Sequence, residues 1–259
     1  MTKTEVVVYG NQELLAAAAA ARLVTRLVDV QAAKGTASLV LTGGGTGIAV
    51  LSELRKSSAR DAIDWSRLDI YWGDERFVPA DSDERNEKGA REALLDHVPV
   101  DPKRIYAMAP SDGEFGDDVD AAAAAYAEVL AANAGPEDHG DVPSFDIMLL
   151  GLGGEGHTAS VFPETPAVYE TERSVVAVRN CAKPPPTRIS LTLPALRRAR
   201  DIWLMTAGEA KADAVALALA GAGEVQLPVS GARGQRRTLW LLDRGAASKL
   251  TKVYQPPTA

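Results

Sequence analysis

The stretch FDIMLLGLGGEGHTASVFP, residues 145–163, decides which fold this chain adopts. Its first part, Phe145 to Leu150, is almost continuously apolar, which is typical of a strand buried on both faces in a parallel sheet. The strand runs directly into a glycine-rich turn that ends at His157. Because ligands bind beyond the carboxyl ends of strands in open α/β sheets, we expect the functional site to include this turn.

The rest of the chain alternates short β-branched runs with longer helical patterns. Further strands are predicted at residues 5–9, 38–41, 68–72, 174–178, 188–193, 201–207 and 238–243. Asn11 is placed to cap an Ala- and Leu-rich helix that Gly35 ends, and a second helix is predicted from Ile48. The pattern predicts an α/β fold with a mostly parallel, Rossmann-like sheet and helices on both faces, formed as a single domain over residues 1–259.

Composition narrows the possible functions. The chain has 259 residues and a formal net charge of −7, so it has no broad positive field for nucleic acid or anionic lipid. A single cysteine, Cys181, cannot form an intramolecular disulfide, and three scattered histidines lack the spacing of a zinc site. With no apolar run long enough to span a bilayer and no signal segment, we expect a cytoplasmic protein without metal, cofactor, nucleic-acid or membrane partners. The sequence carries no signal for oligomeric state.

The glycine run GGGTG, residues 43–47, follows the predicted strand at 38–41. It is either a tight strand-to-helix turn or an anion site. Glycines let backbone N–H groups approach an oxyanion, and the N-terminus of the next helix is partially positive. Gly44, Gly45 and Thr46 are therefore candidate phosphate-binding residues. No lysine follows them, so the Walker pattern for nucleotides is not met.

His157 is the candidate catalytic base. A lone histidine is more often structural, but this one follows a glycine turn at the end of an apolar strand. With a pKa near 6.5, histidine can accept a proton from water at neutral pH if a neighbour fixes its tautomer. Glu155, two residues earlier, is the candidate neighbour. His97 and His139 lie in segments that predict solvated side chains.

The letters GLGGEG also fit the dinucleotide pattern G-x-G-x-x-G. Two features argue against a dinucleotide site. Pro163 interrupts the helix that should follow the glycines, and Glu170 and Glu172 precede the next strand, whereas the acidic partner of a ribose should lie at that strand's end.

Four other charged residues could complete a pocket for an anionic substrate. Asp74 and Arg76 end a buried strand, Arg188 opens another, and Lys211 lies early in a predicted helix. Arginine can hold a phosphate through two parallel hydrogen bonds, and Asp74 can accept hydrogen bonds from sugar hydroxyls. Taken singly, each of these residues would be interpreted as a solvated surface charge.

Taken together, five segments resemble the 6-phosphogluconolactonase family. They are SLVLTGGGTG, DIYWGDERFVP with Asn86 and Arg91, FDIMLLGLGGEGHTASVFP, TRISLTLP and TAGEAK. This family is similar in fold to glucosamine-6-phosphate deaminase. Arg76 directly after Asp74-Glu75 is a lactonase-like feature, because deaminases usually carry tyrosine there. The chain departs from the pattern at Glu155, where aspartate is common, and at Gly45-Thr46-Gly47, where Ser-Thr-Pro is common.

The resemblance implies hydrolysis of 6-phospho-D-glucono-1,5-lactone to 6-phosphogluconate, the second step of the oxidative pentose phosphate pathway. It implies a sugar-phosphate lactone as the small-molecule partner, with His157, Glu155 and Asp74 as catalytic residues. A lactone is an activated ester, so a positioned water and a general base suffice without a covalent nucleophile or a metal.

Two rival functions are compatible with parts of this pattern. An amino-sugar-phosphate deaminase or isomerase would use Asp74 as the base that removes a carbon-bound proton. A non-catalytic sugar-phosphate sensor would carry a DNA-binding segment, and no basic helix-turn-helix precedes Glu5.

Overall fold

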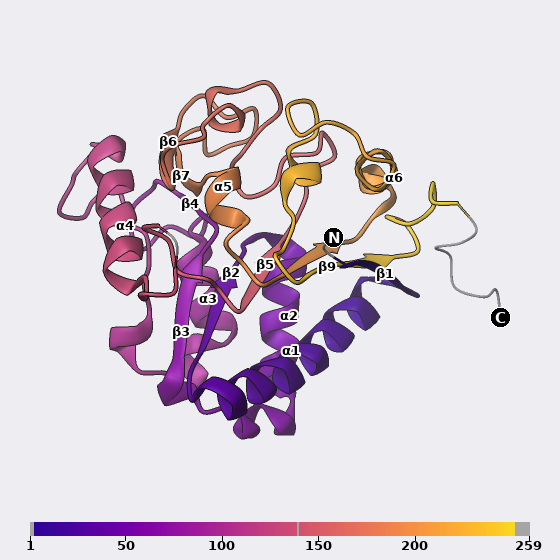
Figure 1. Cartoon of the computed structure of the whole chain (residues 1–259), viewed down its shortest axis with the longest axis horizontal. Coiled ribbons are helices and arrows are strands. Elements are labelled where there is room, and N and C mark those ends of the chain that lie inside the picture. Colours follow the sequence, from indigo (N-terminus) through magenta and orange to yellow (C-terminus); the bar gives the residue numbers. More distant parts are fainter. Residues whose placement is uncertain (1–2, 139, 252–259) are drawn as a thin grey trace.

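The computed structural model describes residues 3–138 and 140–251. Six parallel strands form the main sheet. In spatial order they are β1 (Lys3–Tyr9), β9 (Arg237–Asp243), β8 (Asp201–Thr206), β5 (Ile147–Leu150), β2 (Ala37–Leu41) and β3 (Leu68–Trp72). The predicted mostly parallel sheet is therefore confirmed (Figure 1).

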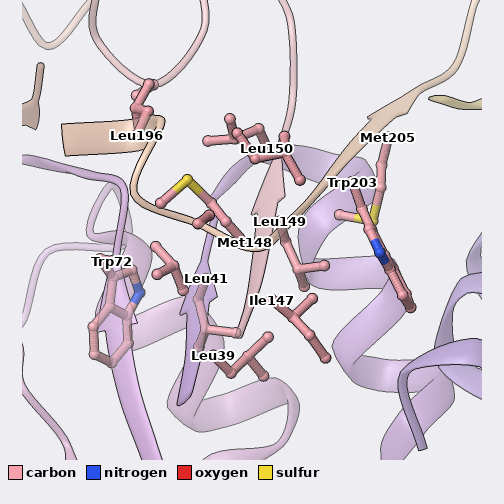
Figure 2. Packing of buried hydrophobic residues seen from close by; sticks show 14 of the residues in the cluster. Leu39, Leu41, Trp72, Ile147, Met148, Leu149, Leu150, Leu196, Trp203 and Met205 are labelled. Carbon is pink, nitrogen blue, oxygen red and sulfur yellow. The ribbon is translucent and has the colours of Figure 1, made fainter. Parts of the chain in front are cut away.

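The apolar strand β5 lies in the interior of this sheet, between β2 and β8. All four of its side chains, from Ile147 to Leu150, are at most 1% exposed. Figure 2 shows them packed among side chains of the neighbouring strands, including Leu39 and Trp203. Burying a large aliphatic side chain contributes about 1.5–3 kcal/mol, so β5 is a main source of stability and a rigid support for the turn after it.

Helices cover both faces of the sheet (Figure 1). On one face lie α1 (Gln12–Lys34) and α2 (Gly44–Lys56), which pack against each other, with α3 (Asn86–Ala93) beside α2. The other face carries α5 (Leu193–Leu196) and α6 (Ala212–Leu219). None of the helices within residues 3–138 and 140–251 is long and apolar enough to cross a bilayer.

The ends of α1 follow the sequence signals. The side chain of Asn11 accepts a 2.8 Å hydrogen bond from the Leu14 N–H, and Gly35 ends the helix with a φ of 79°. The start of α2 differs from the prediction, because the helix begins at Gly44 and not at Ile48. The glycine run is thus the first turn of α2, with Gly43 as its N-cap.

A second, antiparallel sheet was not foreseen as a separate unit. It consists of β4 (Asp74–Arg76), β7 (Arg188–Leu191) and β6 (Val175–Val178), and α4 (Val119–Asn133) packs against β6 and β7. Asp74 to Arg76 was predicted to be a strand end leading into a loop. These residues instead form a short strand whose Arg76 pairs with Arg188. Three charged residues carry no apolar alternation, so nothing in their pattern indicated a strand.

Candidate active site

One pocket opens at the carboxyl edge of the main sheet. The lining residues come from the segments that follow β2, β5 and β8, from the start of α3 and from the second sheet. They are Thr42, Gly43, Gly44, Asp74, Arg76, Asn86, Gly151, Leu152, His157, Ala159, Arg188 and Lys211. A second pocket adjoins the first and is lined by Gly45 and Thr46, as well as by Gly44 and Lys211. The structure therefore gathers the predicted site residues at one edge. Of the predicted site residues, Glu155 alone lines neither pocket.

His157 and Glu155 form a hydrogen-bonded pair in the turn after β5. The Nδ1 atom of His157 lies 2.8 Å from Glu155 Oε1, and the other carboxylate oxygen of Glu155 lies 2.9 Å from Lys183 Nζ. The imidazole ring stacks on the ring of Phe162, with 4.5 Å between centroids. Because an ionised carboxylate only accepts hydrogen bonds, Nδ1 carries the proton in the neutral ring and Nε2 is left as the basic nitrogen.

The pKa values of this pair fit a neutral base beside an ionised acid. Burial would raise the pKa of Glu155, but hydrogen bonds from its own backbone N–H, from Lys183 and from His157 lower it to about 2. Burial lowers the pKa of His157 below its ordinary value; the charge of Glu155 opposes this effect and that of Lys183 adds to it. At neutral pH the imidazole is therefore uncharged and able to accept a proton.

The glycines before His157 are required by close packing. A Cβ atom on Gly153 would lie 2.1 Å from His157 Nδ1 and 2.6 Å from Glu155 Oε2. Gly156 has a φ of 90° and packs on Leu227. No helix follows these glycines, since the chain from Gly151 to Thr165 consists of turns, bends and isolated bridges. The turn thus lacks the helix N-terminus that a dinucleotide pyrophosphate requires.

Asp74 is held in a buried hydrogen-bonded group that the sequence interpretation missed. The hydroxyl of Ser160 donates a 2.6 Å hydrogen bond to Asp74 Oδ2, and Arg188 Nη1 lies 4.0 Å from the same oxygen. Ser160 is fully buried. Its position three residues after His157 was the only signal available, because Asp74 is 86 residues away in sequence.

Arg188 is not a solvated charge, as its side chain is only 5% exposed. Its guanidinium makes four hydrogen bonds within the protein, to the carbonyls of Lys183, Pro184 and Pro185 and to the hydroxyl of Ser160. Since a guanidinium has five N–H groups, one N–H is left for a ligand. Arg188 is therefore mainly a wall of the pocket that holds Ser160 and Asp74 in place.

The N-terminus of α2 forms another part of the pocket lining. Gly44 has a φ of 78°, which glycine adopts without strain. Gly43 must be glycine for another reason, because a Cβ atom there would lie 1.8 Å from Asn86 Oδ1. In the adjoining pocket, the Thr206 hydroxyl is buried and has no hydrogen-bond partner within the described part of the chain. A helix N-terminus and an unpaired hydroxyl are both suited to bind an anion.

Lys211 lines both pockets at their junction. Burial, together with the charge of Lys183, lowers its pKa from the ordinary value. It makes no ion pair that the structure records within residues 3–138 and 140–251. Across the same residues, no three His, Cys, Asp or Glu side chains lie close enough together to hold a metal ion.

The fold and this pocket define an α/β protein with a histidine–glutamate pair and a helix N-terminus at the carboxyl edge of its sheet. Comparison with known sequences is more specific. The chain belongs to the family described as glucosamine-6-phosphate isomerases/6-phosphogluconolactonase, whose sequence model matches residues 10–240. The family resemblance predicted from the motifs is confirmed.

Individual relatives agree with this assignment. A curated 6-phosphogluconolactonase of Streptomyces coelicolor is 60% identical over 255 residues, covering 98% of each chain. The solved 6-phosphogluconolactonase of Trypanosoma brucei is 28% identical with a TM-score of 0.83, covering 97% of this chain and all of the other. A monomeric glucosamine-6-phosphate deaminase, 20% identical with a TM-score of 0.76 and covering 95% of this chain and 99% of that one, confirms the predicted similarity of fold.

Proposed function

We propose that this chain hydrolyses 6-phospho-D-glucono-1,5-lactone to 6-phospho-D-gluconate in the oxidative pentose phosphate pathway. The proposal rests chiefly on the pairing of His157 with Glu155 at a pocket whose other walls suit an anion. The relative that is 60% identical over nearly the whole chain carries the name of this activity.

His157 is the general base in the proposed reaction. Its Nε2 atom removes a proton from a water molecule, whose oxygen attacks the lactone carbonyl carbon and forms a tetrahedral oxyanion. Collapse of this intermediate breaks the bond between the carbonyl carbon and the ring oxygen. The proton on His157 then passes to the ring oxygen, which leaves as a hydroxyl group. The reaction consumes one water molecule and returns the histidine to its neutral form, and the new carboxylic acid releases its proton to solvent to give 6-phospho-D-gluconate.

Glu155 orients the base and is not itself a proton acceptor in this scheme. Its ionised carboxylate fixes the tautomer of His157 with the proton on Nδ1, and it stabilises the imidazolium while the proton is held. Glutamate is one methylene longer than the aspartate common at this position, and the 2.8 Å contact is compatible with the same task.

We place the phosphate where the two pockets meet, against the N-terminus of α2. There the N–H groups of Gly44, Gly45 and Thr46 and the ammonium of Lys211 would surround it. Arg76 lines the same pocket and would contribute a guanidinium. Asp74, held by Ser160 and Arg188, would accept hydrogen bonds from ring hydroxyls and so orient the carbonyl towards His157.

A kinetic assay tests the reaction directly. Lactone is generated freshly from glucose 6-phosphate, and its disappearance is followed with and without the protein. We expect hydrolysis well above the spontaneous rate and no ammonia release from glucosamine 6-phosphate. Ammonia release would indicate the deaminase alternative, and binding without either reaction would indicate a sensor.

We further propose that this activity is cytoplasmic. A single cysteine and the lack of long apolar helices in the described residues support this placement. The net charge of −7 supports a small anionic substrate held by a local pocket in preference to a nucleic-acid partner.

A further inference from the structure

Glu75 is a buried carboxylate beside the pocket to which the proposed reaction gives no role. Its neighbours Asp74 and Arg76 both line the pocket, but Glu75 does not, because successive side chains of a strand point to opposite sides. Glu75 is only 1% exposed. Burial raises its pKa to about 7, against the opposing effects of Arg85 and of three backbone N–H groups.

The three N–H groups belong to both ends of one loop. Glu75 Oε1 accepts hydrogen bonds from the N–H of Arg76 at 2.8 Å and from the N–H of Asn86 at 2.7 Å. Oε2 accepts one from the N–H of Glu87 at 2.8 Å. The chain leaves β4 at Arg76 and returns at Asn86, so this single carboxylate joins the beginning and the end of the loop at residues 77–85.

The same carboxylate begins α3. Asn86 and Glu87 are the first two residues of this helix, and its N-cap, Arg85, supplies no side-chain acceptor. The first N–H groups of a helix have no partner within the helix and favour a negative charge. Glu75 supplies the acceptor from another strand, and in its ionised form it also supplies the negative charge. Arg85, with Nη2 3.8 Å from Glu75 Oε2, is itself anchored by the Met108 carbonyl.

Two pocket side chains depend on this loop. Arg76 Nη1 donates a 2.6 Å hydrogen bond to the carbonyl of Glu84, near the end of the loop. Asn86 Nδ2 donates to the Asp74 carbonyl at 2.9 Å, and its Oδ1 occupies the space that a Cβ atom on Gly43 would need. Both side chains are therefore held at the point where Glu75 joins the loop ends, Asn86 against the N-cap of α2 and Arg76 in the pocket wall.

We propose that Glu75 is a positioning residue that holds Arg76 and Asn86 in register with the phosphate-binding wall. This inference rests on the proposed function, since it requires a phosphorylated substrate at that wall. Glu75 would act on recognition of the phosphate and leave the proton transfers at His157 unchanged.

The test compares two lactones with the Glu75→Gln variant. Glutamine keeps the size of glutamate but places an NH₂ group against one of the backbone N–H donors. We expect KM for 6-phospho-D-glucono-1,5-lactone to rise about tenfold with kcat changed less than about twofold, as for one weakened charge-assisted contact. Hydrolysis of unphosphorylated D-glucono-1,5-lactone should stay unchanged. A loss that is equal for both lactones, or no loss, would overturn the proposal.

Glu170→Gln is the matched control. The carboxylate of Glu170 also accepts two backbone N–H groups, those of Glu172 and Arg173, but Glu170 does not line the active-site pocket. The Glu170→Gln variant should leave the ratio of the activities on the two lactones unaltered. If Glu75→Gln does not fold, Glu75→Asp keeps the charge but is too short to reach both loop ends, so it should show the same phosphate-specific rise in KM.

A double variant identifies the residue through which Glu75 acts. In an Arg76→Met background, Glu75→Gln should raise KM for the phosphorylated lactone by much less than about tenfold. The reason is that the contact between Arg76 and the phosphate, which Glu75 supports, is already lost. Fully additive effects would overturn the proposed route through Arg76. Wild-type protein without activity on the phosphorylated lactone would instead refute the proposed function, and the two failures are therefore distinguishable.

Discussion

Buried charged groups are paired differently at the two ends of the strands of the main sheet, the amino edge and the carboxyl edge. At the amino edge, Asp201 is fully buried and ion-pairs with Arg26, Arg236 and Arg237. Asp146 at the start of β5 is likewise bound by Lys34 at 2.7 Å and by the N–H of Ser38 at 3.0 Å. Each carboxylate there is surrounded by cations or donors.

At the carboxyl edge the pairing is left incomplete. His157 has one ring nitrogen engaged, Arg188 has one N–H left over, and Lys211 has no recorded ion pair in the described residues. In this protein, buried charges with every group paired have a structural role, whereas the carboxyl edge keeps a basic nitrogen and an ammonium that are free to meet a ligand.

The largest expected effect is on catalysis at the carboxyl edge. His157→Ala should lower kcat by about a hundredfold to ten-thousandfold, the usual cost of removing a general base. The measurement is the rate of lactone hydrolysis after subtraction of the spontaneous rate. His97→Ala, at an exposed histidine remote from the pocket, is the control and should keep full activity. Near-normal turnover by His157→Ala would refute the assignment.

At the amino edge we expect an effect on stability without one on catalysis. Asp201→Asn removes the charge that compensates three arginines, and breaking such a buried group costs about 3 kcal/mol. Urea unfolding measures the loss in free energy of unfolding. The values of kcat and KM at 25 °C should be those of the wild type, and a selective rise in KM would show that the two edges are not functionally separate.

Lys211→Ala should have a smaller effect, confined to substrate binding. Loss of one charge-assisted phosphate contact weakens binding by about 1.5–3 kcal/mol, which corresponds to a rise in KM of at least about tenfold with little change in kcat. Lys249→Ala is a suitable control, because its ammonium pairs with Asp213 at 2.7 Å and does not line the pocket. An unchanged KM would indicate that Lys211 is a solvated surface charge that does not bind the substrate.

The smallest expected effects are shifts in pH dependence. Since burial lowers the pKa of His157, kcat/KM should fall on the acid side only below pH 6.5, as the ring becomes protonated. Lys183→Met removes a positive charge and should move this acid limb to higher pH. Glu155→Gln removes a negative charge and should move it to lower pH. Shifts in the same direction would contradict the proposed electrostatic roles.

Much of the fold was predictable because its signals are local. The apolar run at β5, the cap at Asn11 and the stop at Gly35 each act over a few residues, and the structure confirms all three. The second sheet was missed because β4 is held in place by pairing with β7, more than a hundred residues later. Pairing with a distant strand leaves no hydrophobic periodicity in a stretch of three charged residues, so the sequence gives no sign of it.

In the site, too, contacts between residues close in sequence could be predicted, and contacts between distant segments could not. His157 and Glu155 are two residues apart, so their contact could be anticipated from the turn. Ser160 with Asp74, and Lys183 with Glu155, are contacts between distant segments, and only the fold brings them together. The buried state of Arg188 was also hidden, because its partners are backbone carbonyls, which no side-chain pattern reveals.

The order of strands in the main sheet has a consequence for how the chain is made. The first strand, β1, pairs with β9, the last strand of the described chain, from Lys3 beside Arg237 to Tyr9 beside Asp243. During synthesis, β1 leaves the ribosome long before its partner exists. The backbone N–H and C=O groups that β1 uses in this pairing therefore have no partner until residues 237–243 have been synthesised.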